Sequence, residues 1–288
     1  MRRVLLLAPV LGLLAFAQDF SEIKIEQLGK GYSYTEGPAW SVKDNYLIFS
    51  DTPADRLMKW VPGHAVEVFR EKAGGPSGNA FDAEGRLYTC ETRERRVTRT
   101  SKTGAVEVLA DKWEGKRLNA PNDIVVSKTG HVYFTDPAFG EQADHRELDF
   151  YGIYTVPPKG PMKLVAKPTG RPNGIALSPN GKVLYVANSD ERNVRAYDLD
   201  KNGDASNERV LVSGIAGIPG GIRVDDKGNL YVTTNHIEVY SAAGKPVHTI
   251  TMHTRPSNIG FGEPDLMTMF VTEGSFVYRM RLDVKGAY

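Results

Sequence analysis

Short runs of β-branched and aromatic residues recur along nearly the whole chain, and a turn separates each run from the next. A typical example is the turn Lys128-Thr129-Gly130 followed by His131-Val132-Tyr133-Phe134. Runs of this length bounded by turn residues predict β-strands. No segment shows the long amphipathic period of a helix. The chain is therefore expected to be all-β.

A short cassette precedes these runs and changes its polar residue from copy to copy. The copies are Pro121-Asn122-Asp123-Ile124, Pro172-Asn173-Gly174-Ile175, Pro219-Gly220-Gly221-Ile222 and Pro256-Ser257-Asn258-Ile259, with a related Glu36-Gly37-Pro38. The turn glycines Gly85, Gly130, Gly181 and Gly228 lie 45, 51 and 47 residues apart. Such intervals are typical of propeller blades. Six units predict a six-bladed β-propeller with four-stranded antiparallel blades.

The two ends of the chain are expected to meet in the last blade. The sixth unit, from Asn258 to Leu282, supplies only three strands. The segment from Ile23 to Leu28 alternates apolar and polar residues, so it is predicted to add the outer strand and hide an open edge. No domain boundary interrupts the pattern. Residues 18–288 are therefore predicted to form one propeller domain.

Residues 1–17 have the features of a secretory signal peptide. Arg2 and Arg3 precede an apolar run from Val4 to Phe16, which ends in Ala15-Phe16-Ala17. A basic start, a short apolar stretch and an A-x-A site predict cleavage after Ala17. We therefore expect a secreted or periplasmic protein that no longer associates with a membrane after cleavage. A net charge of +1 gives no support for nucleic-acid binding.

In a propeller, two sets of polar residues are expected on one face, around the axis. The first set is the polar position of each cassette: Glu36, Ser77, Asn122, Asn173, Gly220 and Asn258. The second set follows the second strand of each unit: Asp51, Glu91, Asp136, Asn188, Asn235, His236 and Glu273. Carboxylate and carboxamide oxygens suit Ca²⁺ and tolerate Mg²⁺ or Mn²⁺. The alternative is structural, since Asn at a strand entrance often hydrogen-bonds its own turn.

Four segments carry a resemblance to a known family. They are Lys116-Arg117-Leu118-Asn119-Ala120-Pro121-Asn122-Asp123, Tyr133-Phe134-Thr135-Asp136-Pro137, Glu36-Gly37-Pro38-Ala39-Trp40 and Pro172-Asn173-Gly174-Ile175-Ala176-Leu177-Ser178-Pro179-Asn180-Gly181. Together they resemble the gluconolactonase branch of the regucalcin/gluconolactonase family. The resemblance implies a six-bladed propeller with one divalent cation in the central channel, usually calcium, with magnesium, manganese and zinc as alternatives. It also implies a hydrolase that opens a lactone, although relatives open other esters or phosphotriesters.

Carried over to this chain, the resemblance implies that Glu36 and Asn173 bind the metal. Asn122 is expected to contact the metal or the substrate beside it. The family's fourth position is an Asp that binds the metal and is its presumed general base, and here it is Gly220. A positioned base is typically worth about 10²- to 10⁴-fold in rate, so this departure puts the catalytic step in doubt.

Three alternatives remain open for the missing Asp. His236 or Asp136 takes over as the catalytic base, the cation activates water without one, or the protein binds a ligand without turning it over. Each substitute also has a non-catalytic interpretation: Asp136 caps a turn before Pro137, and His236 is an exposed loop residue. Arg117 and Asn119 are expected to contact substrate hydroxyls.

These observations predict a monomeric, divalent-metal-dependent lactonase or esterase acting on a sugar lactone or similar cyclic ester. The alternative is a catalytically weak or inactive extracytoplasmic propeller that binds a ligand.

Overall fold

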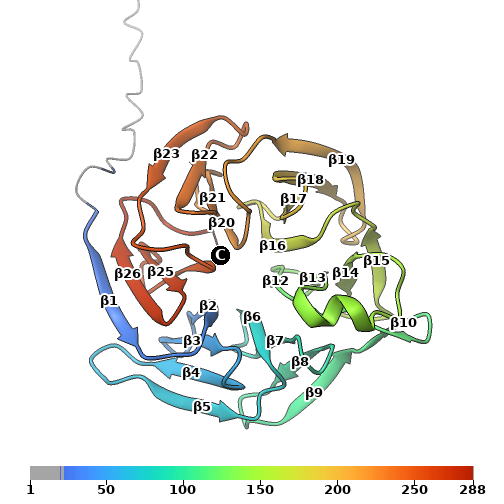
Figure 1. Ribbon diagram of the computed structural model, residues 1–288, viewed down its shortest axis with the longest axis horizontal. Coiled ribbons are helices and arrows are strands. Elements are labelled where there is room, and N and C mark those ends of the chain that lie inside the picture. The colour runs from blue at the N-terminus through green and yellow to red at the C-terminus, as the bar shows by residue number, and fades with distance from the viewer. Residues whose placement is uncertain (1–19, 21–22, 288) are drawn as a thin grey trace, which may run out of the picture.

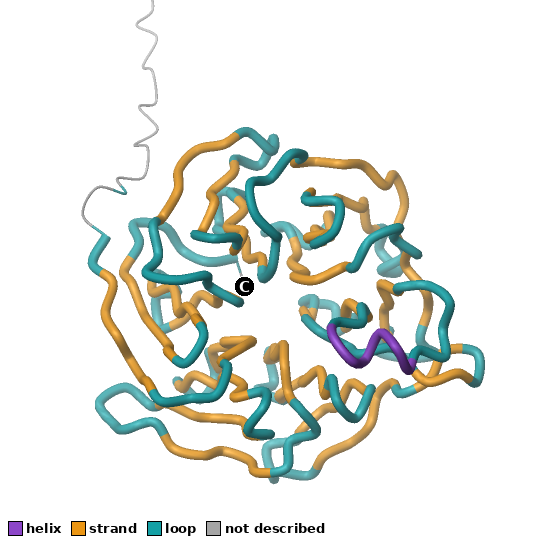
Figure 2. Tube along the Cα trace, in the orientation of Figure 1, coloured by secondary structure: helices purple, strands orange, loops and turns teal. Residues whose placement is uncertain are grey.

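Six four-stranded antiparallel sheets surround a central axis in this computed structural model, which describes Phe20 and residues 23–287 (Figure 1). The sheets are the blades of a propeller, and strands account for most of the ring (Figure 2). The predicted fold class is confirmed. The predicted signal peptide, residues 1–17, lies outside the described residues.

Within each blade the chain runs outward from the axis. Blade one holds β2 (Thr35–Ser41), β3 (Tyr46–Asp51), β4 (Arg56–Trp60) and β5 (Glu67–Glu71). Blade two holds β6 (Pro76–Phe81), β7 (Leu87–Glu91), β8 (Arg96–Thr100) and β9 (Val106–Ala110). Blade three holds β12 (Ile124–Val126), β13 (Val132–Asp136), β14 (Gly152–Val156) and β15 (Lys163–Ala166).

Blades four to six repeat this order. Blade four holds β16 (Pro172–Leu177), β17 (Val183–Asn188), β18 (Asn193–Leu199) and β19 (Ala205–Val212). Blade five holds β20 (Ile222–Val224), β21 (Leu230–Thr233), β22 (Ile237–Tyr240) and β23 (Pro246–Ile250). Blade six holds β24 (Asn258–Gly262), β25 (Thr268–Glu273), β26 (Phe276–Arg281) and, as its outer strand, β1 (Ile25–Lys30).

The N-terminal strand closes the ring as predicted. β1 pairs antiparallel with β26, from Ile25 opposite Met280 to Lys30 opposite Phe276. The observed strand begins two residues later than the predicted segment from Ile23 to Leu28. Because the first and last strands share one sheet, the edge of β26 is covered and the circle is held by backbone hydrogen bonds.

Glycine recurs at the same turn position of several blades for one local reason, its backbone conformation. All four adopt left-handed backbone angles, with φ between 69° and 87°, at Gly85, Gly130, Gly181 and Gly228. Each donates its N–H to the carbonyl three residues earlier, as Gly130 does to Ser127 at 2.9 Å. Glycine enters this region without a steric penalty. The turn between the first two strands therefore selects glycine in blade after blade.

The cores lie between neighbouring blades. Trp40 of blade one stacks on Phe270 of blade six with ring centroids 5.7 Å apart. Tyr133 and Ile153 of blade three join one apolar cluster with Ile175 of blade four. Because each sheet is covered on both faces, the second strands are buried throughout, β13 and β25 among them. Continuous burial explains why these strands read as unbroken apolar runs.

Two elements lie outside the repeating pattern of four-stranded blades. A hairpin of β10 (Lys112–Trp113) and β11 (Lys116–Arg117) precedes the third cassette. The insertion between β13 and β14 carries the short 3-10 helix η1 (Gly140–His145). The described part of the chain holds no helix with the length and apolar character needed to cross a bilayer.

Candidate functional site at the cassette end of the channel

The cassettes enter the central channel at one end, and their backbones are joined from blade to blade. Gly78 N–H donates to Asn122 O at 2.7 Å, and Gly174 N–H donates to Gly220 O at 3.0 Å. A Cβ on Gly174 would lie 2.4 Å from Gly220 O, so the contact requires glycine. These bonds hold the cassettes at the same level of the channel. Their polar positions therefore surround one axis.

Glu36 on β2 is a carboxylate held among neutral and acidic groups. Its Oε2 accepts the Gly37 N–H at 3.1 Å, and the residue retains some solvent contact. Burial and the nearby Asp123 raise the pKa of Glu36 to about 7, although Gly37, Asn258 and Arg223 oppose the shift. The hydrogen bonds and the positive charge near Glu36 therefore do not offset the cost of ionising it in this place, and a cation next to the carboxylate would be favourable.

The two asparagines of the predicted metal site are partly exposed and offer free oxygens. Among the described residues, the carboxamide of Asn122 has no hydrogen-bond partner. Asn173 donates from Nδ2 to Ser189 Oγ at 3.1 Å, which leaves its Oδ1 available. One carboxylate and two carboxamide oxygens are hard ligands that fit calcium or a similar cation. The residues present thus fit the predicted metal.

Such a site depends on carboxamides. Across Phe20 and residues 23–287, no group of three or more His, Cys, Asp or Glu side chains is arranged to hold a metal ion. The cassette residue Asn258 also differs from Asn122 and Asn173, because it is buried and its Oδ1 accepts the Ile259 N–H at 2.9 Å. For Asn258 the structural interpretation is sufficient.

Gly220, which replaces the expected Asp, lies in a filled part of the channel wall. A Cβ there would approach Thr233 Oγ1 to 2.7 Å and Ser257 O to 2.9 Å. The Thr233 hydroxyl donates to Ser257 O at 3.1 Å. The space beside this backbone is therefore occupied by a threonine hydroxyl, and no carboxylate takes the place of the missing one at this position.

Asp136, a predicted base, anchors a loop. Its Oδ2 accepts the Asn119 N–H and its Oδ1 the Ala120 N–H, both at 2.8 Å, and the residue is completely buried. Burial raises the pKa of Asp136 to about 7, while the two backbone amides and Arg95 oppose the shift. This geometry accounts for the carboxylate without catalysis. The partner is the loop before the third cassette rather than the turn before Pro137.

The same type of anchor recurs around the ring. Asp51 Oδ1 accepts the Ser33 N–H at 2.9 Å, Asp190 Oδ2 accepts the Arg171 N–H at 2.8 Å, and Glu273 Oε1 accepts the Thr254 N–H at 2.5 Å. Each carboxylate ends or follows a second strand and holds the segment leading into its own blade's first strand. We call these side chains, with Asp136, the entry anchors. They give a structural explanation for Asp51, Asp136 and Glu273 of the second polar set.

His236, the other predicted base, lies in the loop between β21 and β22 and is partly exposed. Its Nδ1 faces the Met252 N–H at 3.2 Å and accepts from it. An Nδ1 that accepts a hydrogen bond does so through its lone pair. The lone pair that a base requires is thus engaged by the backbone.

The two predicted substrate contacts differ from each other. Asn119 is buried and donates to Asp136 O at 3.0 Å and to Phe150 O at 2.9 Å, so it fastens the insertion in blade three. Arg117 is exposed at the rim and donates from Nη2 to Glu94 O at 3.1 Å. A substrate role therefore stays a prediction for Arg117, whereas the hydrogen bonds of Asn119 describe a structural residue.

Sequence reasoning missed an ion pair inside the channel. Arg223 Nη1 lies 3.2 Å from Asp123 Oδ2, and Asp123 is fully buried. Asp123 also accepts the N–H groups of Ile124 and Ile175, at 3.0 and 3.2 Å. The available signal was that Asp123 occupies a cassette position where the next two copies have glycine.

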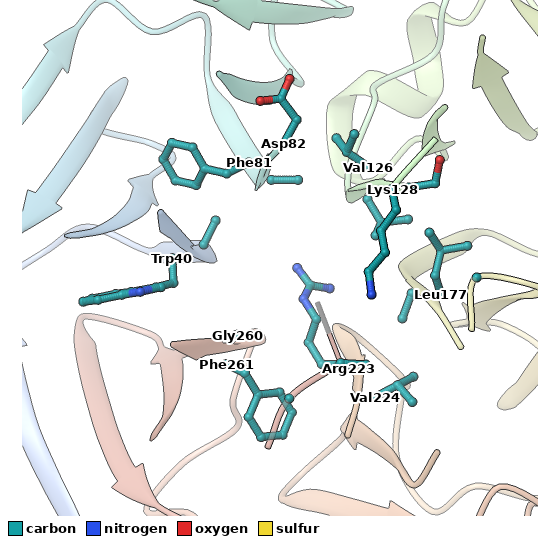
Figure 3. Close-up of a pocket in the computed structure, with 18 of the residues that line it drawn as sticks. Trp40, Phe81, Asp82, Val126, Lys128, Leu177, Arg223, Val224, Gly260 and Phe261 are labelled. Carbon is teal, nitrogen blue, oxygen red and sulfur yellow. The ribbon is translucent and has the colours of Figure 1, made fainter. Parts of the chain in front are cut away.

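A cavity of about 250 Å³ lies elsewhere along the channel. Its wall comes from the far ends of the inner strands and the turns after them, with Trp40, Lys128 and Arg223 among the lining residues (Figure 3). Glu36, Asn122 and Asn173 do not line it. The cavity and the candidate metal site are thus separate places, and the metal assignment rests on the ligand chemistry of the cassettes.

Comparisons with known proteins agree with this architecture. A gluconolactonase of Zymomonas mobilis is 32% identical over 293 aligned residues, covering 91% of this chain and 82% of that protein. A regucalcin of Xenopus laevis is 27% identical, covering 88% of this chain and 87% of its own length.

Solved structures show the same relationship. A structure of a gluconolactonase from Xanthomonas campestris superposes with a TM-score of 0.85 at 30% identity, covering 91% of this chain and 90% of the other. A calcium-binding regucalcin structure from Agrobacterium tumefaciens, at 17% identity and a TM-score of 0.78, shares the fold. The family model described as the SMP-30/Gluconolactonase/LRE-like region matches residues 34–275, and this chain belongs to that family.

Proposed function

We propose that this protein is a lactonase whose divalent cation is held by Glu36, Asn122 and Asn173 at the cassette end of the channel. The observation that carries the proposal is Glu36, a channel carboxylate whose pKa is raised to about 7, together with carboxamide oxygens at the equivalent cassette positions that accept no hydrogen bond from a described residue. Similarity to gluconolactonases supports the reaction class. A sugar lactone or similar cyclic ester is the proposed substrate, and calcium the proposed cation.

The chain's own residues would prepare the site. Glu36 supplies the negative charge, and Asn122 and Asn173 supply neutral oxygens. Ser189 accepts the Asn173 amide at 3.1 Å and so orients its oxygen. When bound, a divalent cation would polarise the lactone carbonyl and stabilise the charge that develops on its oxygen.

The catalytic base is the open part of the mechanism. Asp136 and His236 remain predictions, and both are engaged by backbone N–H groups. Recruiting His236 requires breaking its contact with Met252, which frees Nδ1. Recruiting Asp136 requires releasing the loop at Asn119, and that loop leads directly into the third cassette.

We also propose that the protein is exported, as a monomer acting on a small molecule. The support is the sequence of residues 1–17, with Arg2 and Arg3 before an apolar stretch and an A-x-A site.

The test of the proposed function is a panel of sugar and aliphatic lactones, assayed with and without chelator alongside the metal content of the purified protein. Hydrolysis that chelator abolishes and calcium restores is the expected result. Hydrolysis unaffected by chelator would reject the metal role. A metal-free protein that opens no lactone would reject the proposal as a whole.

Replacing Glu36, the carboxylate of the candidate metal site, gives a sharper prediction. Glu36→Gln should weaken calcium binding by at least about tenfold, since even changes to groups supporting a ligand cost 10- to 100-fold. Lactone hydrolysis should fall with it. Calorimetric calcium titration measures the first effect and initial rates the second. Glu107→Gln, at an exposed glutamate on β9, is the matched control. Equal calcium affinity in the two variants would remove Glu36 from the site.

A second candidate function is ligand binding without turnover. Gly220 lacks a side chain, and both substitute bases already accept backbone hydrogen bonds. This arrangement favours a protein that holds a lactone or sugar at the cation without opening the ring. Binding of lactones in calorimetry, with no hydrolysis over hours, would select this function over the first.

A further inference from the structure

The 250 Å³ cavity has a position and a lining that the proposed lactonase site does not use. The polar cassette positions lie at or before the start of the inner strands, whereas the cavity is walled mainly by later residues of those strands and the turns that follow. Residues 124–129 of blade three and 176–181 of blade four contribute two sides. Gly286 and Ala287 near the C-terminus also line the wall, and so do the cassette residues Pro38 and Ile124. The cavity therefore lies farther along the channel than Glu36, Asn122 and Asn173.

Most of the wall is apolar. Leu177 and Phe261, both partly buried, contribute hydrophobic surface from two blades, and the nearly buried Trp40 and Phe81 also line the cavity. Figure 3 shows the Arg223 guanidinium projecting toward an open centre, whereas the rings of Trp40 and Phe81 point away from it. An apolar chamber into which a cation projects suits a ligand that has an apolar body and an anionic group.

One edge of the Arg223 guanidinium is free. Its Nη1 makes the protein contacts, to Asp123 Oδ2 at 3.2 Å, Ile175 O at 3.3 Å and Ile222 O at 2.7 Å. Within the described part of the chain, Nε and Nη2 have no acceptor. Only 17% of the side chain is exposed, so few waters can serve these donors. The Nε–Nη2 edge has the fork geometry that binds a carboxylate through two parallel hydrogen bonds.

The charges around the cavity favour an anion. Lys128 is exposed in the turn after β12, makes no ion pair with any described residue, and points into the same space (Figure 3). The carboxylate of Asp82 also lines the cavity, but it is engaged by Arg86 Nε at 2.5 Å and the Tyr88 hydroxyl at 2.9 Å. Asp123 neutralises one side of Arg223 from within the channel wall. The charge of Lys128 is left without a protein partner.

We propose that this cavity binds a small organic monocarboxylate with an apolar body, such as a short aliphatic or aromatic acid. The carboxylate accepts hydrogen bonds from Nε and Nη2 of Arg223 and lies near Lys128. The body packs against Leu177 and Phe261. An inorganic anion would leave these walls uncovered, and a neutral apolar molecule would leave the guanidinium donors unpaired in a desolvated place. The site does not include Glu36, Asn122 or Asn173, although Arg223 also acts electrostatically on Glu36.

Calorimetric titration of the chain without its first 17 residues tests the proposal. Benzoate and hexanoate are the probes, and benzyl alcohol and 1-hexanol are their neutral counterparts. The acids should bind at least about tenfold more tightly than the alcohols, because charge-assisted hydrogen bonds are about twice as strong as neutral ones. Equal affinity for acid and alcohol, or no binding of either acid, would overturn the proposal.

Variants separate the two sites in the channel. Arg223→Lys keeps the charge beside Asp123 but loses the fork, and Lys128→Gln removes an exposed charge that folding does not need. Each should weaken benzoate binding by at least about fivefold. Lys227→Gln, in the corresponding turn of blade five and outside the cavity wall, is the matched control and should change nothing.

A further measurement establishes where benzoate binds. Glu36→Gln should bind benzoate as well as the parent does, and loss of binding there would assign the acid to the metal site instead. Lys128→Gln should leave lactone hydrolysis unchanged, so the outcome does not depend on the proposed activity.

Discussion

Glu36 is the residue on which the candidate metal site depends, because it is the only carboxylate among the polar positions Glu36, Ser77, Asn122, Asn173, Gly220 and Asn258. Its pKa is raised to about 7 mainly by burial, in part by Asp123. An unfolded chain would ionise this group near its ordinary value of 4.5. The folded, metal-free protein therefore binds the extra proton, and its free energy of unfolding falls as the pH rises from about 4.5 to about 7. A cation bound to Glu36 would favour the ionised carboxylate and so offset this loss of stability at higher pH.

This linkage predicts how calcium stabilisation depends on pH. Calcium requires the ionised form of Glu36, so its affinity should rise about tenfold between about pH 6 and about pH 8. Thermal unfolding with and without calcium across this range measures the effect as a difference in Tm. In Glu36→Gln the pH dependence should disappear. A calcium effect that is constant with pH in the parent protein would show that Glu36 is already ionised or does not bind.

Gly220 gives a second prediction at the residue scale. Gly220→Asp restores the family's missing carboxylate and should raise lactone hydrolysis, within the 10²- to 10⁴-fold range typical of a positioned base. The new Cβ meets Thr233 Oγ1 at 2.7 Å, so the variant should also unfold at a lower temperature. Gly220→Ala carries the same steric cost without the carboxylate and is the control. Equal activity in both variants would favour the binding function.

The sequence repeat predicts which cassette positions lie around the axis, but it carries no information about the loop residues next to them. Glu36, Asn122 and Asn173 follow from a repeat, and a repeat predicts position around an axis directly. Asn119 depends on a loop conformation that no periodicity encodes, as its bonds to Asp136 and Phe150 show. Arg223 was not predicted as a site residue, because it pairs with Asp123, which lies 100 residues away in the chain.

The entry anchors recur from blade to blade, as the turn glycines do, and each fixes the conformation of one connecting segment. Each anchor ends or follows the second strand of a blade and fixes the segment that leads into the first strand of the same blade. In blade three, Asp136 holds Asn119 and Ala120, and Asn122 follows two residues later. The position of a candidate metal ligand is therefore set by a buried carboxylate that does not itself face the axis. Read from the sequence, such a residue is indistinguishable from a catalytic one.

A comparison of two anchors distinguishes support from catalysis. Asp136→Asn replaces one accepting oxygen with a donor, so it should lose about 1–3 kcal/mol of stability through an unsatisfied buried N–H. Asp51→Asn makes the same change in blade one, where no base is predicted. If Asp136 is only an anchor, both variants should unfold earlier and keep lactone hydrolysis within about tenfold of the parent. A loss of about 10²-fold or more confined to Asp136→Asn would restore the catalytic role.

At the scale of the whole molecule, repetition made the fold predictable. Blade count, strand order and ring closure all follow from the spacing of the turn glycines and the unpaired segment before the first blade. The β10–β11 hairpin and η1 break the repeat, so the pattern carried no information about their structure. The C-terminal residues also escaped prediction. Gly286 N–H donates to Leu266 O at 2.9 Å and Ala287 N–H to Val224 O at 2.8 Å, which joins blade six to blade five.

Closure by β1 leads to a prediction about the complete ring. A chain that begins at Gln18 retains β1, whereas a chain that begins at Gly31 lacks it and leaves the edge of β26 unpaired. The shorter chain should lose a few kcal/mol of stability, which lowers Tm by roughly 5–10 °C for a protein of this size. Its exposed edge should also promote association. Thermal unfolding and size-exclusion chromatography of the two chains measure both effects. Equal Tm and a monomeric profile for both would mean that the apolar contacts between blades hold the circle without the shared sheet.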